Sequence, residues 1–379
     1  MLETIFWICL AICVFAYVGY SLSILVIGLV FRRKLGREDI EPGVTLLITA
    51  YNEELDIGRK LEQSLQLDYP REQLEILVAS DGSTDRTDDI VREFADRGVR
   101  LLRVEGRVGK TGTQNEAVPH AKGEVIVFSD ATTRYEPDAI RKLVRNYADP
   151  KVGAVSGRYE YVDETGASTG AGTIAFWKYE NLVKQTQSGI RTITGCCGCI
   201  YSVRKALYVP LPHDIISDLV QPLKIVAQGY RIVFEDEAIA YEETTEGSGE
   251  EFSMRVRVIT RGMRGMLHMR ELFNPFRYPW IAYQLVGHKV LRWFVPVFGA
   301  GMLISAGFLL EQPFYLLAFL GMLAILAMAA AGAVAERLGK CPAVLRLPLY
   351  FVIVNLASLA AMRQVAVGVK AATWETVRR

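Results

Sequence analysis

Residues 5–31 are the feature that most constrains what this chain can fold into. The run IFWICLAICVFAYVGYSLSILVIGLVF carries no charged side chain, and it exceeds the roughly 20 residues that a helix needs to cross the hydrocarbon core of a bilayer. It is also longer than the apolar core of a cleaved signal peptide, usually ~7 to 15 residues. We therefore predict a retained membrane-spanning helix within residues 1–34.

Basic residues follow this span directly, whereas the short leader before it carries only Glu3 as a charged side chain. These basic residues are Arg32, Arg33, Lys34 and Arg37. Because Lys and Arg favour the cytoplasmic side of a membrane, we expect the central part of the chain to be cytoplasmic. The chain is then a multi-pass protein of the inner (plasma) membrane.

The C-terminal region, residues 294–379, is apolar again. Residues 294–310 and 313–335 are each about as long as a crossing requires, and residues 347–362 form a weaker third candidate. The third segment either crosses the membrane or lies at its interface, so the sequence leaves the side of the C-terminal tail open. Residues 276–293 mix Trp, Tyr, Arg, Lys and His with apolar residues, which predicts an interfacial helix.

Residues 40–275 have the composition of a soluble α/β domain, with charges throughout. Strands are predicted over Thr45–Thr49 and Glu75–Ala79, and a helix over Leu55–Gln66. A third strand, in "EVIVFSDA", follows a further helical stretch. Strands that alternate with helices predict a mostly parallel sheet.

Ligands of such sheets bind beyond the carboxyl ends of the strands. Polar turns follow the three predicted strands at residues 51–53, 81–83 and 130–132, and we expect them to converge on one crevice. Each turn alone is also typical of ordinary turn and cap chemistry.

Two classes of function are disfavoured by composition. The net charge of +1, without a basic stripe in the central domain, gives no sign of nucleic-acid binding. Three of the six cysteines form one cluster, Cys196, Cys197 and Cys199, with no nearby His, whereas structural zinc sites usually use two paired clusters. We expect reduced thiols.

Taken in order, the polar turns and the segments after them resemble the motifs of a known family. The segments are "TAYNEE", "ASDGSTDRT", "GKTGTQNEA", "VFSDATTRYEPDAI", "TGCCGCIYSVRK", "ISDLVQPLKIVAQGYRIVFEDEAIAYEE" and "MRVRVITRG". They look like the successive motifs of membrane-bound family 2 glycosyltransferases of the polysaccharide synthase branch, which use the nucleotide-sugar-binding GT-A fold. The resemblance covers about residues 43–265.

The resemblance implies how a nucleotide-sugar donor, most simply a UDP-sugar, would be held. Tyr51 and Glu53 would contact the base or ribose, and Asp81 would accept a hydrogen bond from one of them. Lys110 and Asn115 would lie beside the diphosphate.

A divalent metal, Mg²⁺ or Mn²⁺, would neutralise the diphosphate as a Lewis acid. Asp130 matches the first acid of the family's Asp-Ala-Asp motif, whereas Thr132 replaces the second. A hydroxyl can ligate Mg²⁺ directly or through water. We therefore expect a weakened metal site at Asp130 and Thr132, with metal-independent transfer as the alternative.

The resemblance also implies the catalytic base. Inverting transfer needs a group that takes the proton from the acceptor hydroxyl, and Asp218 stands where the family has its base. The alternative role for Asp218 is that of an acid in the first turn of a helix, where the helix dipole favours it.

The segment "MRVRVITRG" aligns with the family's Gln-Arg-x-Arg-Trp motif, in which arginines stabilise the leaving diphosphate. This alignment predicts that role for Arg257 and Arg261, and it places Val258 where processive members carry a Trp that stacks on the acceptor sugar. Cys197 and Gly198 match the segment beside the acceptor.

These observations predict an inverting glycosyltransferase that adds sugar to a growing glycan at the inner membrane, most simply in exopolysaccharide synthesis. One alternative is single addition to a lipid-linked acceptor, which the missing Trp suits. The other is a non-catalytic membrane receptor that binds nucleotide sugars. Membrane lipids are expected partners, and the sequence does not identify any export or assembly subunit.

Overall fold

The structure is a computed structural model that describes all residues except 32, 34–35, 163–169, 244–247, 340 and 370–379. Two parts of the predicted topology, Arg32 and Lys34 of the basic cluster and the C-terminal tail, lie outside the described residues. The strands are β1 (Val44–Ala50), β2 (Leu74–Ser80), β3 (Val99–Arg103), β4 (Val125–Asp130), β5 (Arg134–Tyr135), β6 (Val152–Val162), β7 (Tyr201–Arg204) and β8 (Arg231–Glu243).

Long and short helices surround these strands. In the central region they are α3 (Ile57–Ser64), α4 (Thr87–Glu93), α5 (Gly109–Ala117), α6 (Ala139–Val144), α7 (Gly170–Ile190), α8 (Ser217–Ala227) and α9 (Ser248–His268). Toward the two ends they are α1 (Leu2–Val14), α2 (Tyr20–Val30), α10 (Pro279–Gln284), α11 (Leu291–Gly307), α12 (Pro313–Arg337) and α13 (Ala343–Val367). Two π-helical turns, η1 (Phe15–Gly19) and η8 (Leu285–Val290), interrupt the terminal ones.

The strands form one sheet of order β3-β2-β1-β4-β7-β6-β8-β5. The predicted parallel sheet is confirmed for β3, β2, β1 and β4, whereas β7 and β5 run antiparallel to their neighbours, so the whole sheet is mixed. The predicted strands and helix occur within two residues of their expected ends.

Helices cover both faces of this sheet, which explains why its parallel strands read as continuous apolar runs. Successive side chains of a strand point to opposite faces. Accordingly, Leu46 and Ile48 of β1 pack in one core with Ile57 of α3, while Leu47 packs in a second core with Leu223 of α8.

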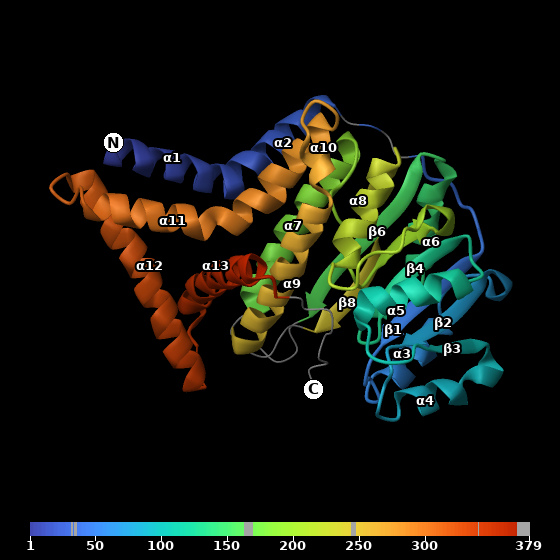
Figure 1. The fold of residues 1–379 in the computed structure, drawn as a ribbon. Coiled ribbons are helices and arrows are strands. Elements are labelled where there is room, and N and C mark those ends of the chain that lie inside the picture. Colours follow the sequence, from blue (N-terminus) through green and yellow to red (C-terminus); the bar gives the residue numbers. More distant parts are fainter. Residues whose placement is uncertain (32, 34–35, 163–169, 244–247, 340, 370–379) are drawn as a thin grey trace.

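Four helical segments are long and apolar enough to cross a membrane: Leu2–Val30, Pro279–Gly307, Pro313–Arg337 and Ala343–Val367. In Figure 1 they extend away from the sheet, with α7 and α9 between them and the sheet. The first of them packs along α11, and α13 packs along α9. Glu3 accepts a hydrogen bond from Gln312 at 2.8 Å, so the far ends of the first two segments meet.

One prediction about these segments is corrected. The expected interfacial helix 276–293 and the expected span 294–310 are not separate, because α10, η8 and α11 form one continuous helix. Two of the charged residues in the first part are paired with Glu180 of α7, which lies 3.0 Å from the Arg292 guanidinium and 3.3 Å from the Lys289 ammonium. Whether this part touches the membrane surface stays a prediction.

Candidate active site

The polar turns after β1 and β2 meet at the carboxyl edge of the sheet, as expected. Asn52 has a φ of 54°, which directs its side chain across to the second turn. Its backbone N–H donates to Ser83 Oγ at 3.1 Å, and its Oδ1 accepts from the backbone N–H of Thr84 at 2.8 Å. The backbone N–H of Glu53 donates to Thr87 Oγ1 at 2.7 Å. These bonds fix the turns against each other.

Asp81 is fully buried (0% exposed), and its carboxylate faces the start of α5. It accepts hydrogen bonds from the backbone N–H groups of Val108 at 2.8 Å and Gly109 at 3.0 Å. The carboxylate thus holds the loop that positions Lys110, and the contact of Asp81 with the base or ribose stays a prediction.

Lys110 contacts two other predicted site residues. Its ammonium forms an ion pair with Asp130 at the end of β4 and lies 3.4 Å from the carbonyl oxygen of Gly198. Burial by itself would lower the pKa of Lys110, but the Asp130 carboxylate more than compensates, and the pKa is raised. The side chain is therefore a fixed positive charge.

Asn115, later in α5, bonds a different part of the chain. Its side-chain N–H donates to the Leu211 carbonyl at 2.7 Å, and its Oδ1 accepts from Tyr208 Oη at 2.9 Å. The amide anchors the segment before α8, so these contacts give its predicted donor role no support.

Asp218 lies in the first turn of α8, directly against Gly198. A Cβ added to Gly198 would lie 2.4 Å from Asp218 Oδ2, so only glycine fits beside this carboxylate. Burial raises the pKa of Asp218, although Lys110 and Arg261 oppose the shift. A carboxylate with a raised pKa is a better proton acceptor.

Cys197, the neighbour of Gly198, is buried (2% exposed) and packs beneath the site. Its Sγ lies 3.2 Å from the Lys184 ammonium, and its backbone N–H donates to Ser156 Oγ at 3.0 Å. These contacts fix the backbone next to Gly198, which lies against Asp218. All six cysteines are free thiols in the structure, as expected.

The two predicted arginines of α9 differ in the contacts that they make. Arg261 is buried and donates to the Ile215 carbonyl at 2.8 Å and to Thr111 Oγ1 at 3.0 Å, so it ties α9 to the segment before α8. Arg257 is half-buried and makes no hydrogen bond or ion pair with any described residue. Burial lowers the pKa of Arg257, and Asp130 opposes this. Of these two arginines, Arg257 is therefore the one available to bind an anion.

Tyr51 and Glu53 lie in the turn that follows β1. The Arg107 guanidinium lies 4.0 Å from the centroid of the Tyr51 ring. Burial, followed by the charges of Asp56 and Asp130, raises the pKa of Glu53 to about 8. Glu53 is therefore protonated at neutral pH and can donate a hydrogen bond.

Sequence reasoning missed Lys60 and Glu242. Lys60 of α3 is buried, donates to the Thr133 carbonyl at 2.7 Å and lies over the Tyr135 ring, and its burial lowers its pKa to about 7. Glu242 at the end of β8 accepts a hydrogen bond from Thr132 Oγ1 at 3.1 Å. In the sequence, Lys60 could have been found as a charged residue on the otherwise apolar face of the predicted helix.

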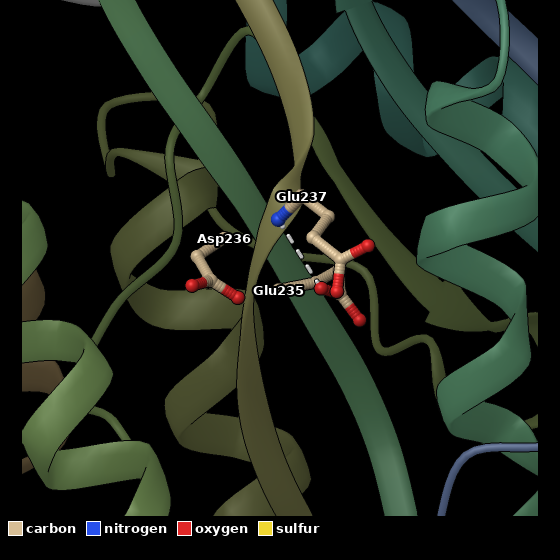
Figure 2. Close-up of side chains that lie close together, drawn as sticks. All are labelled: Glu235, Asp236 and Glu237. Atoms are coloured by element: carbon tan, nitrogen blue, oxygen red, sulfur yellow. Dashed lines mark hydrogen bonds between the residues drawn. The ribbon is translucent and has the colours of Figure 1, made fainter.

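The oxygen atoms near Asp130 suit a hard divalent cation, because Mg²⁺ and Mn²⁺ prefer carboxylate, hydroxyl and water ligands. A second acidic group, Glu235, Asp236 and Glu237, has carboxylate oxygens within 4.8 Å of one another (Figure 2). The charge of this group is balanced by arginines. Arg145 contacts both carboxylate oxygens of the buried Glu235 at 2.9 and 3.0 Å, and Arg37 lies 3.2 Å from the same carboxylate.

Comparison with known proteins finds a family and relatives with similar sequences. Residues 45–209 match the family "Glycosyl transferase family 2". The chain is 26% identical over 241 residues to the poly-beta-1,6-N-acetyl-D-glucosamine synthase of Staphylococcus aureus (strain COL), a match that covers 62% of this chain and 58% of the relative. The synthase of Staphylococcus epidermidis is 27% identical over 221 residues, or 57% of this chain and 53% of that protein.

The fold is also found among solved structures. The mannosyltransferase PcManGT of Pyrobaculum calidifontis, in complex with GDP-Man and Mn²⁺, superposes with a TM-score of 0.74 at 23% identity, over 96% of this chain and 98% of that chain. This likeness establishes a common fold. The matched region spans less than two thirds of the staphylococcal synthases.

Proposed function

Because residues 45–209 form a family 2 glycosyltransferase domain on a GT-A fold, we propose that this chain is an inverting glycosyltransferase. It would take the sugar from a nucleotide-sugar donor, a UDP-sugar in the simplest case, and add it to a growing glycan. The reaction would take place at the inner face of the plasma membrane, with the catalytic domain in the cytoplasm.

One observation carries this proposal: Lys110 contacts both Asp130 and the carbonyl of Gly198, whose Cα lies against the Asp218 carboxylate. A proton acceptor, a fixed cation and a candidate metal ligand thus lie in one continuous cluster at the carboxyl edge of the sheet. That is the set of groups that glycosyl transfer needs.

In the proposed reaction, Asp218 accepts the proton of the acceptor hydroxyl as its oxygen attacks the anomeric carbon. The missing side chain at Gly198 lets the backbone approach this carboxylate without a clash. The nucleoside diphosphate leaves with additional negative charge, which Lys110 and Arg257 would stabilise. A divalent metal held at Asp130 and Thr132 would supply further positive charge as a Lewis acid.

Polymer synthesis is supported by the staphylococcal relatives, which are poly-beta-1,6-N-acetyl-D-glucosamine synthases. Exopolysaccharide synthesis is therefore the function we favour. Single addition to a lipid-linked acceptor is the second candidate, because an exposed Val258 stands at the position of the acceptor-stacking Trp. The fold neighbour binds GDP-Man, so GDP-sugars belong in any donor test.

The test uses the full chain in lipid nanodiscs, a panel of UDP- and GDP-sugars, and mass analysis of the products. Asp218→Asn keeps the size of the side chain and removes its basicity, so turnover should fall by roughly 10² to 10⁴ while nucleotide binding persists. Asp214→Asn is the matched control, since Asp214 pairs with Arg264 outside the cluster.

Wild-type turnover in Asp218→Asn would refute the base assignment. Failure of the wild type to release nucleoside diphosphate from any donor, despite binding it, would favour the non-catalytic receptor.

A further inference from the structure

The metal site that the sequence predicts is one carboxylate short. Thr132 occupies the second acid position, and its neutral hydroxyl binds a divalent cation far more weakly than a carboxylate does. Asp130, the remaining acid, already shares its charge with Lys110. Two such ligands would hold a cation poorly.

The structure brings a second carboxylate to this position from a distant part of the chain. β5 pairs antiparallel with β8, in the register Arg134 to Tyr241 and Tyr135 to Ala240. This register carries Glu242, the next residue of β8, toward the turn that precedes β5. There Glu242 Oε1 lies 3.1 Å from Thr132 Oγ1.

Glu242 is also held in place and shares its surroundings with Asp130. Its Oε2 accepts a hydrogen bond from the Tyr159 hydroxyl of β6, which restricts the rotation of the carboxylate. Its hydrogen bond to Thr132 brings Glu242 to the turn that directly follows Asp130 at the end of β4.

We propose that Glu242 is a metal ligand: it supplies the carboxylate that Thr132 lacks and, with Asp130, binds the divalent cation of the donor diphosphate. This rests on the proposed function, since the diphosphate is the reason for the metal. Thr132 then acts mainly by its hydrogen bond to Glu242, which orients the ligand.

Glu237 provides a matched comparison, because it is an acid on the same strand. Its carboxylate lies 2.7 Å from Arg145 and 2.9 Å from Lys142, so its charge is already met. Any general loss of negative charge on β8 would affect Glu237→Gln and Glu242→Gln alike. A metal ligand would affect only the second.

The experiment measures Mn²⁺ binding directly, by electron paramagnetic resonance of free Mn²⁺, on the full chain in nanodiscs with saturating UDP or GDP. The nucleotide is the one that calorimetry shows to bind more tightly. We expect Glu242→Gln to weaken Mn²⁺ affinity by about tenfold or more, and Glu237→Gln to leave it unchanged. Thr132→Asp in the Glu242→Gln background should restore most of the affinity.

Two results would overturn the proposal: wild-type Mn²⁺ affinity in Glu242→Gln, or nucleotide binding by the wild type with no Mn²⁺ bound. The second result would leave the proposed function standing as metal-independent transfer, whereas binding of neither nucleotide would count against that function itself. Should Glu242→Gln fail to fold, Thr132→Asp alone decides, because a third carboxylate should tighten Mn²⁺ binding only if the cation lies there.

Discussion

At the residue scale, the site is defined by how closely Gly198 approaches Asp218. Backbone in direct contact with a carboxylate is possible only where no Cβ intervenes, and the approach is fixed from below by Cys197. Asp218, the proposed base, is thus positioned beside a residue that has no side chain of its own.

Gly198→Ala tests this contact. The added Cβ would lie 2.4 Å from Asp218 Oδ2, so the carboxylate must move. A misplacement of about 1 Å can lower turnover by about 10², and we expect that loss in kcat with nucleotide affinity unchanged. Gly249→Ala, where the new Cβ meets no neighbour within 4 Å, is the control. Unchanged kcat in Gly198→Ala would mean that the contact is loose.

Glu53 gives a pH prediction. Its pKa rises from 4.5 to about 8 in the folded protein, so between these values the folded state holds a proton that the unfolded chain has released. The free energy of unfolding should therefore fall as pH rises through this interval, by up to about 1.4 kcal/mol per pH unit. Melting temperatures of the apo protein from pH 5 to 8 should fall more steeply for the wild type than for Glu53→Gln.

The exposed neighbour Glu54 serves as the control, since Glu54→Gln should retain the wild-type slope. Parallel melting curves for the wild type and Glu53→Gln would contradict a protonated Glu53.

The sequence could predict the position of a side chain where that position depends on nearby residues, but not where it depends on contacts with distant segments. Asp130, Lys110 and Asp218 could be placed in one site because the order of the motifs predicts where the strand end with Asp130 and the helix starts with Lys110 and Asp218 lie. The partners of Asp81 and Asn115 could not, since each side chain bonds backbone that the fold brings back from a later segment. Glu242 was missed for the same reason: only the pairing of β5 with β8 brings it to Thr132.

At the element scale, α9 connects the site to the membrane region. One side carries Arg257 and Arg261 toward the sheet, while Val256, Ile259 and Met263 pack in a core with α13. Thr260 and Gln364 add a hydrogen bond of 3.0 Å between the two helices. The sequence predicted a candidate span at residues 347–362, within α13, but not its contact with α9, because apolar spacing does not reveal which neighbour a helix will face.

Val258→Trp tests whether α9 faces the acceptor. Val258 is 39% exposed and lies outside the α13 contact, so the larger ring should fit without disturbing that packing. Stacking a sugar on the ring removes apolar area from water, worth about 25 cal/mol per Å². We expect longer product chains or higher acceptor affinity, measured by product sizing.

Leu267→Trp, at another exposed position of α9, is the control. If both variants give wild-type products, position 258 does not face the acceptor, and its alignment with the family's Trp is wrong.

At the scale of the whole molecule, charge pairs join the helical region to the catalytic domain. Arg37, which follows the first span, contacts Glu235 of β8, and Glu180 of α7 is surrounded by His288, Lys289 and Arg292. The hydropathy of residues 276–293 could not predict the second group of charge pairs, because Glu180, the anion that balances these cations, lies in another part of the chain.

Glu180→Gln should destabilise the whole assembly. Removing one partner of a buried charge group leaves the other charges uncompensated, which typically costs about 3–5 kcal/mol. We expect a melting temperature several degrees lower in nanodiscs, and little change for Glu160→Gln, whose partner Arg158 is partly exposed. Equal melting temperatures would show that water reaches the Glu180 group.

The ion pair between Lys110 and Asp130 has a consequence for the order in which ligands arrive. A free cation must compete with an ammonium group for Asp130, and a free diphosphate must draw Lys110 away from a carboxylate. When the cation arrives already bound to the diphosphate, Asp130 can bind the cation while Lys110 binds the diphosphate. Binding of metal and nucleotide should therefore be cooperative, each raising the affinity for the other by the same factor.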